Sequence, residues 1–141
     1  MTEGNERPSR ASTDLLVVTK AYDLVRELME RVDRYPRSHK LLLGDRTLTT
    51  AYDLFDLLLE AKYSRDKVAL LDRANFILER LRFQIRLAHD SRLLNAPALG
   101  LLARQMDEVG RLLGGWRRSR LPNPRPPPPG PRHSPTLNSE L

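Results

Sequence analysis

Residues 97–120 read PALGLLARQMDEVGRLLGGWRRSR and carry the clearest helical pattern in the chain. Large apolar side chains recur there every three or four residues, at Leu99, Leu102, Met106, Val109, Leu113 and Trp116. This spacing places them on one face of an α-helix. Pro97 is favoured at a first helical position, whereas Pro122 cannot continue a helix. The stretch therefore predicts an amphipathic helix over 97–120, with Trp116 as a core anchor near its end.

Three earlier segments, 14–34, 38–62 and 64–89, show the same periodicity. Pro36 ends the first segment, Ser64 is a good N-cap for the third, and residues 90–96 form the loop before the last helix. Long helices joined by short connections pack antiparallel. The sequence thus predicts an all-α protein, an up-down antiparallel four-helix bundle.

Each predicted helix has an apolar face. The face of the first helix contains Val18, Tyr22, Val25, Met29 and Val32, and that of the second contains Leu41, Leu48, Tyr52, Phe55 and Leu59. The third helix directs Leu70, Ala74, Ile77, Leu78, Leu81, Ile85 and Ala88 towards the core. We expect these residues to build the interior of the bundle.

The third helix is apolar on a second side as well, where Phe76, Phe83 and Leu87 cluster. The second helix has a similar second set, Leu43, Leu54, Leu57 and Leu58. Every member of a four-helix bundle has an outer side, so a second apolar face favours a contact between subunits. We predict an oligomer interface at Phe76, Phe83 and Leu87. In the alternative, the N-terminal arm or the C-terminal tail covers this face and the protein is a monomer.

Composition fits one basic domain. The chain has 141 residues, no cysteine and a net charge of +6. Residues 66–120 hold eleven Lys or Arg against six Asp or Glu, and all but one of the eleven are arginine, which binds phosphate bidentately. This balance indicates a polyanionic partner. The sequence shows neither a signal peptide nor an apolar stretch of membrane-spanning length, so we expect a cytoplasmic protein without membrane contact.

The chain divides into three parts. Residues 1–12 are expected to form a flexible N-terminal arm, and residues 13–120 form the bundle. Residues 121–141 contain eight of the eleven prolines and are expected to be a disordered tail. A polyproline II ligand is the alternative interpretation of this tail.

No catalytic or metal-binding pattern is present. His39, His89 and His133 have no second histidine or carboxylate at metal-ligand spacing. Carboxylate pairs such as Glu27 with Glu30 have no Glu-x-x-His partner of the di-iron type. We therefore predict no metal, no cofactor and no enzymatic activity.

Two rows of arginines are the candidate binding groups. Arg82 and Arg86 lie one turn apart between the two apolar faces of the third helix, and Arg104, Arg111 and Arg118 recur every seven residues on the fourth. Such rows could follow a phosphate chain, although charged rows on helices are often only solvated faces.

Three blocks carry a family resemblance: YPRSHK at 35–40, LRFQIR at 81–86 and EVGRLLGGW at 108–116. In this order and spacing they resemble the accessory variability determinant (Avd) proteins of diversity-generating retroelements. These proteins belong to a wider four-helix family that includes proteins encoded in ribosomal RNA intervening sequences.

The resemblance implies a homopentameric barrel of four-helix bundles that associates with the retroelement's reverse transcriptase and with template-repeat RNA or DNA. Its role would be non-catalytic support of mutagenic retrohoming. The family's basic pair matches Arg82 and Arg86, the first candidates for polymerase or nucleic-acid contact. The next candidates are Arg37, Lys40, Arg104 and Arg111. The alternative function is a protein-interaction scaffold of the intervening-sequence type without a retroelement role.

Overall fold

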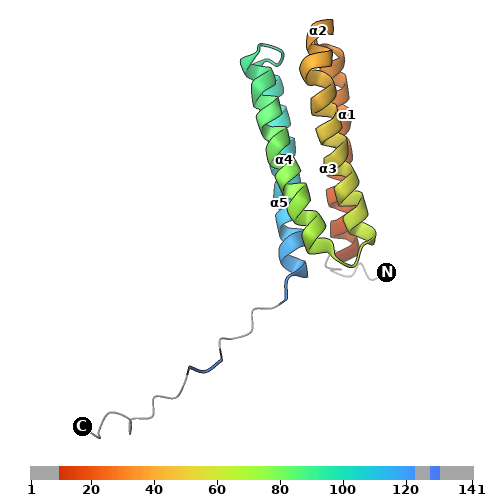
Figure 1. Ribbon diagram of the computed structural model, residues 1–141, viewed down its shortest axis with the longest axis vertical. Helices are drawn as coiled ribbons and strands as arrows, with labels where there is room; N and C mark the ends of the chain where they lie inside the picture. The colour runs from red at the N-terminus through yellow and green to blue at the C-terminus, as the bar shows by residue number, and fades with distance from the viewer. Residues whose placement is uncertain (1–9, 123–127, 131–141) are drawn as a thin grey trace, which may run out of the picture.

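The computed structural model describes residues 10–122 and 128–130, which form four long helices and contain no β-strand (Figure 1). The long helices are α1 (Arg10–Asp33), α3 (Asp45–Tyr63), α4 (Lys67–Asp90) and α5 (Ala96–Arg120). A short helix α2 (Arg37–His39) and a π-helical segment (Lys40–Gly44) lead into α3. The predicted all-helical, four-helix fold is confirmed.

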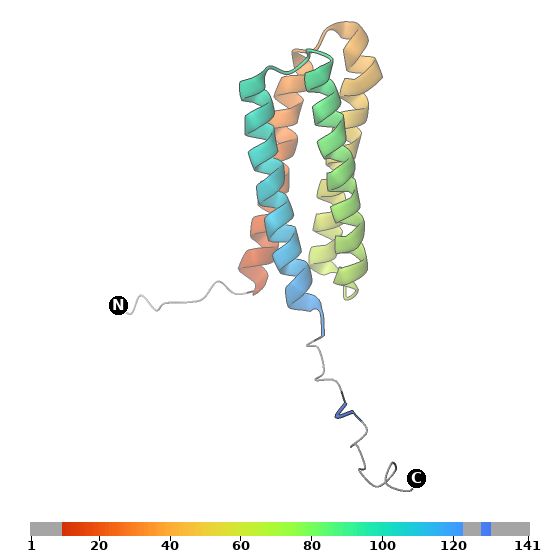
Figure 2. The ribbon, with the colours of Figure 1, turned by 90° about the vertical axis from the view of Figure 1, so that its left-hand side faces the viewer.

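The four long helices stand side by side with alternating direction (Figures 1 and 2). α1 and α4 each pack against both α3 and α5, so they occupy opposite corners of the bundle. We call the end that contains the start of α1, the α3–α4 turn and the last turn of α5 the lower end. The upper end contains α2 and the loop between α4 and α5 (Figure 1).

The core runs the length of the bundle and is built from aliphatic side chains of all four long helices. Its largest fully buried members include Leu28, Leu58, Leu81 and Leu102. Trp116 is only 1% exposed, which confirms it as a core anchor. Burial of each such side chain contributes about 1.5–3 kcal/mol. The core of α5 matches its predicted stripe, except that Leu99 is only partly buried.

The predicted buried face of α3 is wrong. Leu41, Tyr52 and Leu59 are exposed, and Leu48 and Phe55 are only partly buried. The interior is instead reached by Thr47, Thr50, Ala51, Leu54, Leu57, Leu58 and Ala61, which include three members of the second apolar set. The interior face of α3 thus combines three leucines with two threonines and two alanines, and its aromatic side chains Tyr52 and Phe55 lie on the flank.

The face of α1 requires a smaller correction. Val18, Val25 and Val32 are buried as predicted, whereas Tyr22 and Met29 are exposed. Val17, Ala21, Leu24 and Leu28 complete the interior face. The buried face of α1 is therefore rotated towards Ala21 and away from Tyr22 and Met29.

Helix ends also differ from the prediction in detail. Ser64 ends α3 rather than beginning the next helix, and α4 begins at Lys67 after Asp66. The Lys67 ammonium donates to the carbonyls of Ala61 at 2.7 Å and Lys62 at 2.9 Å, which satisfies the last turn of α3. At α5, the Asn95 side chain accepts from the Ala98 N–H at 2.9 Å.

Most of the predicted N-terminal arm and C-terminal tail lies outside the described residues. α1 begins at Arg10, four residues before its expected start. Residues 1–9 of the predicted arm lie outside the described ranges, and so does the predicted tail apart from 121–122 and 128–130.

The π-helical segment Lys40–Gly44 lies where the sequence predicts the first turns of the second helix. A methyl group on buried Gly44 would lie 2.7 Å from Val32 Cγ1, so only glycine lets this segment approach α1. The hydroxyls of Thr47, Thr49 and Thr50 donate to carbonyls four residues earlier. These bonds satisfy the threonines within the helix.

Candidate nucleic-acid interface

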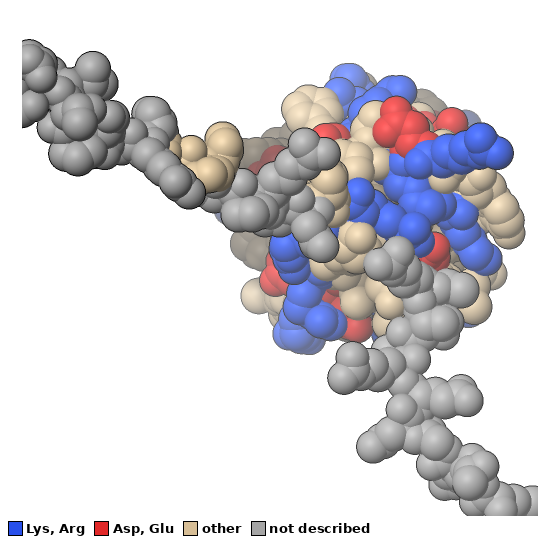
Figure 3. Space-filling model, turned by 90° about the horizontal axis from the view of Figure 1, so that it is seen from below, with Lys and Arg blue, Asp and Glu red and all other residues tan. Residues whose placement is uncertain are grey.

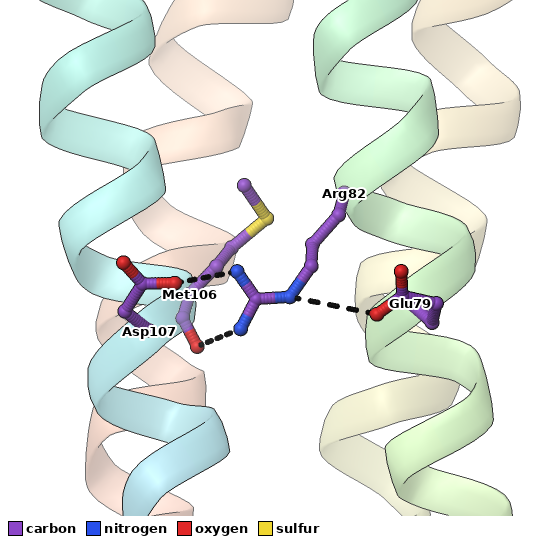
Figure 4. Close-up of polar contacts among 4 residues, drawn as sticks. All are labelled: Glu79, Arg82, Met106 and Asp107. Carbon is purple, nitrogen blue, oxygen red and sulfur yellow. Dashed lines mark hydrogen bonds and ion pairs between the residues drawn. The ribbon is translucent and has the colours of Figure 1, made fainter.

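Arg82 ties α4 to α5 rather than extending freely into solvent (Figure 4). Its Nη1 donates to Asp107 Oδ1 at 2.6 Å, and its Nη2 donates to the Met106 carbonyl at 3.3 Å. Its Nε lies 3.9 Å from Glu79 Oε2. One guanidinium group thus bridges two helices and donates two hydrogen bonds within the bundle.

Gly110 makes room for this bridge. A methyl group there would lie 3.1 Å from Arg82 Nη2 and 3.3 Å from Leu78 Cδ2. The LRFQIR block of α4 and the EVGRLLGGW block of α5 therefore meet in space, with Arg82 lying over Gly110. Arg82 and Gly110, which belong to the two blocks, therefore contribute to the packing of α4 against α5.

Arg86 is the freer member of the pair. Its side chain is 73% exposed, and its only ion pair among the described residues is a 4.0 Å contact with Asp90 on the same helix. Arg86 lies one turn from Arg82 on the same side of α4. The structure therefore separates the predicted pair into an interhelix tie and an available guanidinium.

The α5 row is exposed along its whole length. Arg104, Arg111 and Arg118 all face solvent. Arg111 lies 3.9 Å from Glu108, which also lies 3.8 Å from Lys20 of α1. Helical spacing puts this row on the same side of α5 as Asp107, the partner of Arg82. The flank formed by α4 and α5 thus gathers four of the six predicted basic residues, Arg82, Arg86, Arg104 and Arg111.

Arg37 and Lys40 lie elsewhere, at the upper end beside α1 and α3. Arg37 is exposed, and Lys40 lies 3.5 Å from Asp33. They do not join the cluster on the α4–α5 flank. The first residue of their block, Tyr35, is buried, and this burial raises the pKa of its phenol above the ordinary tyrosine value.

The predicted interface residues form an apolar strip on the outside of α4. Phe76 is 64% exposed, Phe83 61% and Leu87 53%. They line a shallow groove of about 410 Å³ together with Glu79, Arg80 and Gln84. A second apolar strip runs over α1 and α3, where the rings of Tyr22 and Phe55 lie 6.3 Å apart and Tyr52 and Leu59 are exposed. The bundle therefore presents two different apolar strips.

Sequence inspection missed a third basic region, at the lower end. Seen from below, Lys and Arg gather on this end of the bundle (Figure 3). The signal that could have revealed it is the turn sequence KYSRDK at 62–67, in which three cations surround a tyrosine. Arg120 also lies here, with Nη2 3.6 Å from Oδ2 of buried Asp14, a contact that joins α5 to α1.

Two features are absent from the described residues. No group of three or more His, Cys, Asp or Glu residues in them could hold a metal ion. None of their helices is long and apolar enough to cross a membrane.

Fold and surface together define a basic four-helix bundle with an arginine-lined flank and two exposed apolar strips. The sequence model of the bAvd-like family matches residues 15–120, which covers α3, α4 and α5 completely and α1 apart from its residues 10–14. The chain belongs to this bAvd-like family, and the resemblance to Avd proteins is thereby confirmed. A comparison with curated proteins gave no match.

Proposed function

We propose that this protein is a non-catalytic accessory protein of a diversity-generating retroelement. In this role it binds the reverse transcriptase and the template RNA or DNA in the cytoplasm and supports mutagenic retrohoming. The observation that carries the proposal is membership of the bAvd-like family over residues 15–120.

The α4–α5 flank supports a polyanionic partner. Arg86 and Arg111 are 73% and 70% exposed, and their nearest carboxylates lie at 4.0 and 3.9 Å. Such distant, exposed pairs contribute little and exchange readily for phosphate. Arg104 is exposed with no ion pair among the described residues. A phosphate backbone or an acidic surface of the polymerase would find several available guanidinium groups here.

The two apolar strips support the proposed pentamer. A two-fold dimer buries one self-complementary patch, whereas a ring joins two different patches of each subunit head to tail. The strip with Phe76, Phe83 and Leu87 lies on α4, and the strip with Tyr22 and Tyr52 lies on α1 and α3. α1 and α4 occupy opposite corners of the bundle, so the strips face different neighbours. We therefore propose that neighbouring subunits meet at these strips in a ring, and the resemblance to Avd proteins implies that the ring has five members.

The proposal is tested by binding of the full chain to a purified cognate reverse transcriptase and to its template RNA across a salt series. Binding to RNA should weaken steeply with salt, with a logarithmic slope of roughly 0.7–0.9 per phosphate neutralised. Arg86→Gln should reduce that slope, whereas Arg26→Gln, which removes an exposed arginine of α1, should not. A chain that binds protein but no RNA would favour the scaffold of the intervening-sequence type. A chain that binds neither partner would contradict the proposal.

A further inference from the structure

The α3–α4 turn at the lower end presents an aromatic ring between cations. Tyr63 is 77% exposed, the largest exposed fraction among the exposed large apolar and aromatic side chains of the described residues. The ammonium of Lys62 lies 5.2 Å from the centre of its ring. Arg65 follows two residues later and is exposed. No ion pair of Lys62 or Arg65 occurs among the described residues, so both charges are available.

A cleft lies beside this turn, between it and the last turn of α5. Its volume is about 450 Å³, and it is lined by Arg65, Asp66, Lys67, Val68, Ser119 and Arg120. Three of the six lining residues are cations and one is an anion. Arg120 is already paired with Asp14, and Lys67 with the carbonyls that end α3. Arg65 is therefore the lining cation that has neither an ion pair nor a side-chain hydrogen bond among the described residues.

We propose that the lower end is a second nucleic-acid site that holds a single-stranded segment, with a base stacked on Tyr63 and phosphates bound by Lys62 and Arg65. Exposed aromatic rings stack on any unpaired base, and neighbouring cations follow the backbone. A duplex has no free base face to offer such a ring. The inference rests on the proposed function, because the same nucleic-acid partner would reach this end as well as the α4–α5 flank.

The proposed site at the lower end and Arg86 of the α4–α5 flank lie at opposite ends of α4. Lys62, Tyr63 and Arg65 belong to the α3–α4 turn, at the lower end. Arg86 lies near the opposite end of α4, one turn before Asp90. A single strand bound at both places would run along the α4 side of the bundle. Loss of one site should therefore lower the affinity for RNA without abolishing binding.

The test measures the affinity of the full chain for single-stranded RNA and DNA of roughly 20 nucleotides, long enough for several contacts. Lys62→Gln with Arg65→Gln removes two proposed phosphate contacts. At about 0.7 per phosphate, the salt slope should fall by about 1.4, which corresponds to a roughly 25-fold weaker affinity at 0.1 M salt. Arg26→Gln with Arg34→Gln removes the same charge from exposed positions on α1 and just beyond it, and should change neither quantity.

Stacking has its own pair of variants. Tyr63→Ala should weaken binding about tenfold, whereas Tyr63→Phe keeps the ring and should bind as wild type. A duplex of the same length should respond to the double glutamine variant but not to Tyr63→Ala. Circular dichroism confirms that each variant is folded.

Unchanged affinity and slope in the double glutamine variant would overturn the inference while leaving the α4–α5 flank and the proposed function intact. A loss in Tyr63→Phe equal to that in Tyr63→Ala would overturn the stacking contact. Wild-type protein that binds neither RNA nor DNA would overturn both this inference and the nucleic-acid part of the proposed function.

Discussion

Replacing Arg82 with glutamine should destabilise the bundle, whereas the same change at Arg86 should not. Glutamine keeps a straight side chain of similar helix propensity, so the lost guanidinium contacts dominate the effect. The bond to Asp107 joins a side chain that is 31% exposed to one that is 68% exposed. A pair this exposed contributes about 0.2–1 kcal/mol. The 3.3 Å bond to the Met106 carbonyl adds about 0.5–1 kcal/mol.

The expected loss for Arg82→Gln is therefore about 1–2 kcal/mol in the free energy of unfolding. Arg86 has only its 4.0 Å contact with Asp90, so Arg86→Gln should stay within about 0.5 kcal/mol of wild type. The assay is urea unfolding followed by circular dichroism, at one protein concentration because oligomers are stabilised by mass action. A double-mutant cycle with Asp107→Asn isolates the ion pair, with an expected coupling below about 1 kcal/mol.

Equal stability of Arg82→Gln, Arg86→Gln and wild type would refute the assignment of Arg82 as an interhelix tie. If Arg82→Gln instead kept full stability but lost RNA binding, Arg82 would contact the RNA, and its ion pair with Asp107 would not stabilise the bundle. We expect Arg82→Gln to lose stability, and Arg86→Gln to lose affinity for RNA while it keeps the stability of wild type.

Four further substitutions test three other parts of the structure. Phe83→Asp places a charge in the proposed contact between subunits and should reduce the mass measured by light scattering to that of a monomer; an unchanged mass would remove the interface. Gly44→Ala should destabilise by about 1–2 kcal/mol, since its methyl group meets Val32, whereas Gly100→Ala should stabilise by up to about 1 kcal/mol, because glycine is a poor helix former; changes of the same sign would contradict this geometry. Burial raises the pKa of Tyr35 in the folded protein. The stability that the protonated phenol contributes is therefore complete below the ordinary tyrosine pKa of about 10, and it is lost as pH rises from there through the raised pKa. Tyr35→Phe should remove that alkaline loss in urea unfolding, and a variant with the same pH profile as wild type would argue against it.

The fold was predictable because periodicity and helix stops agree along the chain. Pro36 lies between the first two helices, and Pro97 lies in the first turn of α5. These signals are local, so they can be recognised in the sequence before the packing partners of each helix are known. The exposure of Phe76, Phe83 and Leu87 was also predictable, because a second apolar face on one helix is visible in sequence.

The choice between two apolar faces was harder. On α3, Tyr52 and Leu59 point outwards, and the interior is built from three leucines together with small residues such as Ala51. Both faces of α3 contain leucines, so hydrophobicity favours the face that adds aromatic rings, whereas helix packing favours the face that adds alanine and threonine. The sequence does not indicate which of the two requirements applies to a given face until the neighbouring helices are placed.

The role of Arg82 was hidden for a different reason. Its partners Met106 and Asp107 are 24 and 25 residues away along the chain, so no periodicity connects them. Only the packing of α4 on α5, with Gly110 beneath the guanidinium, brings them together. Arg86, four residues further on, has the same sequence context and yet remains exposed.

The central claim, that this chain supports a retroelement reverse transcriptase, is tested most directly by cDNA synthesis from the template-repeat RNA with purified cognate polymerase. Synthesis should depend on added protein, and Arg86→Gln should support less of it than wild type at equal concentration. Equal cDNA yield with and without the protein would contradict the claim.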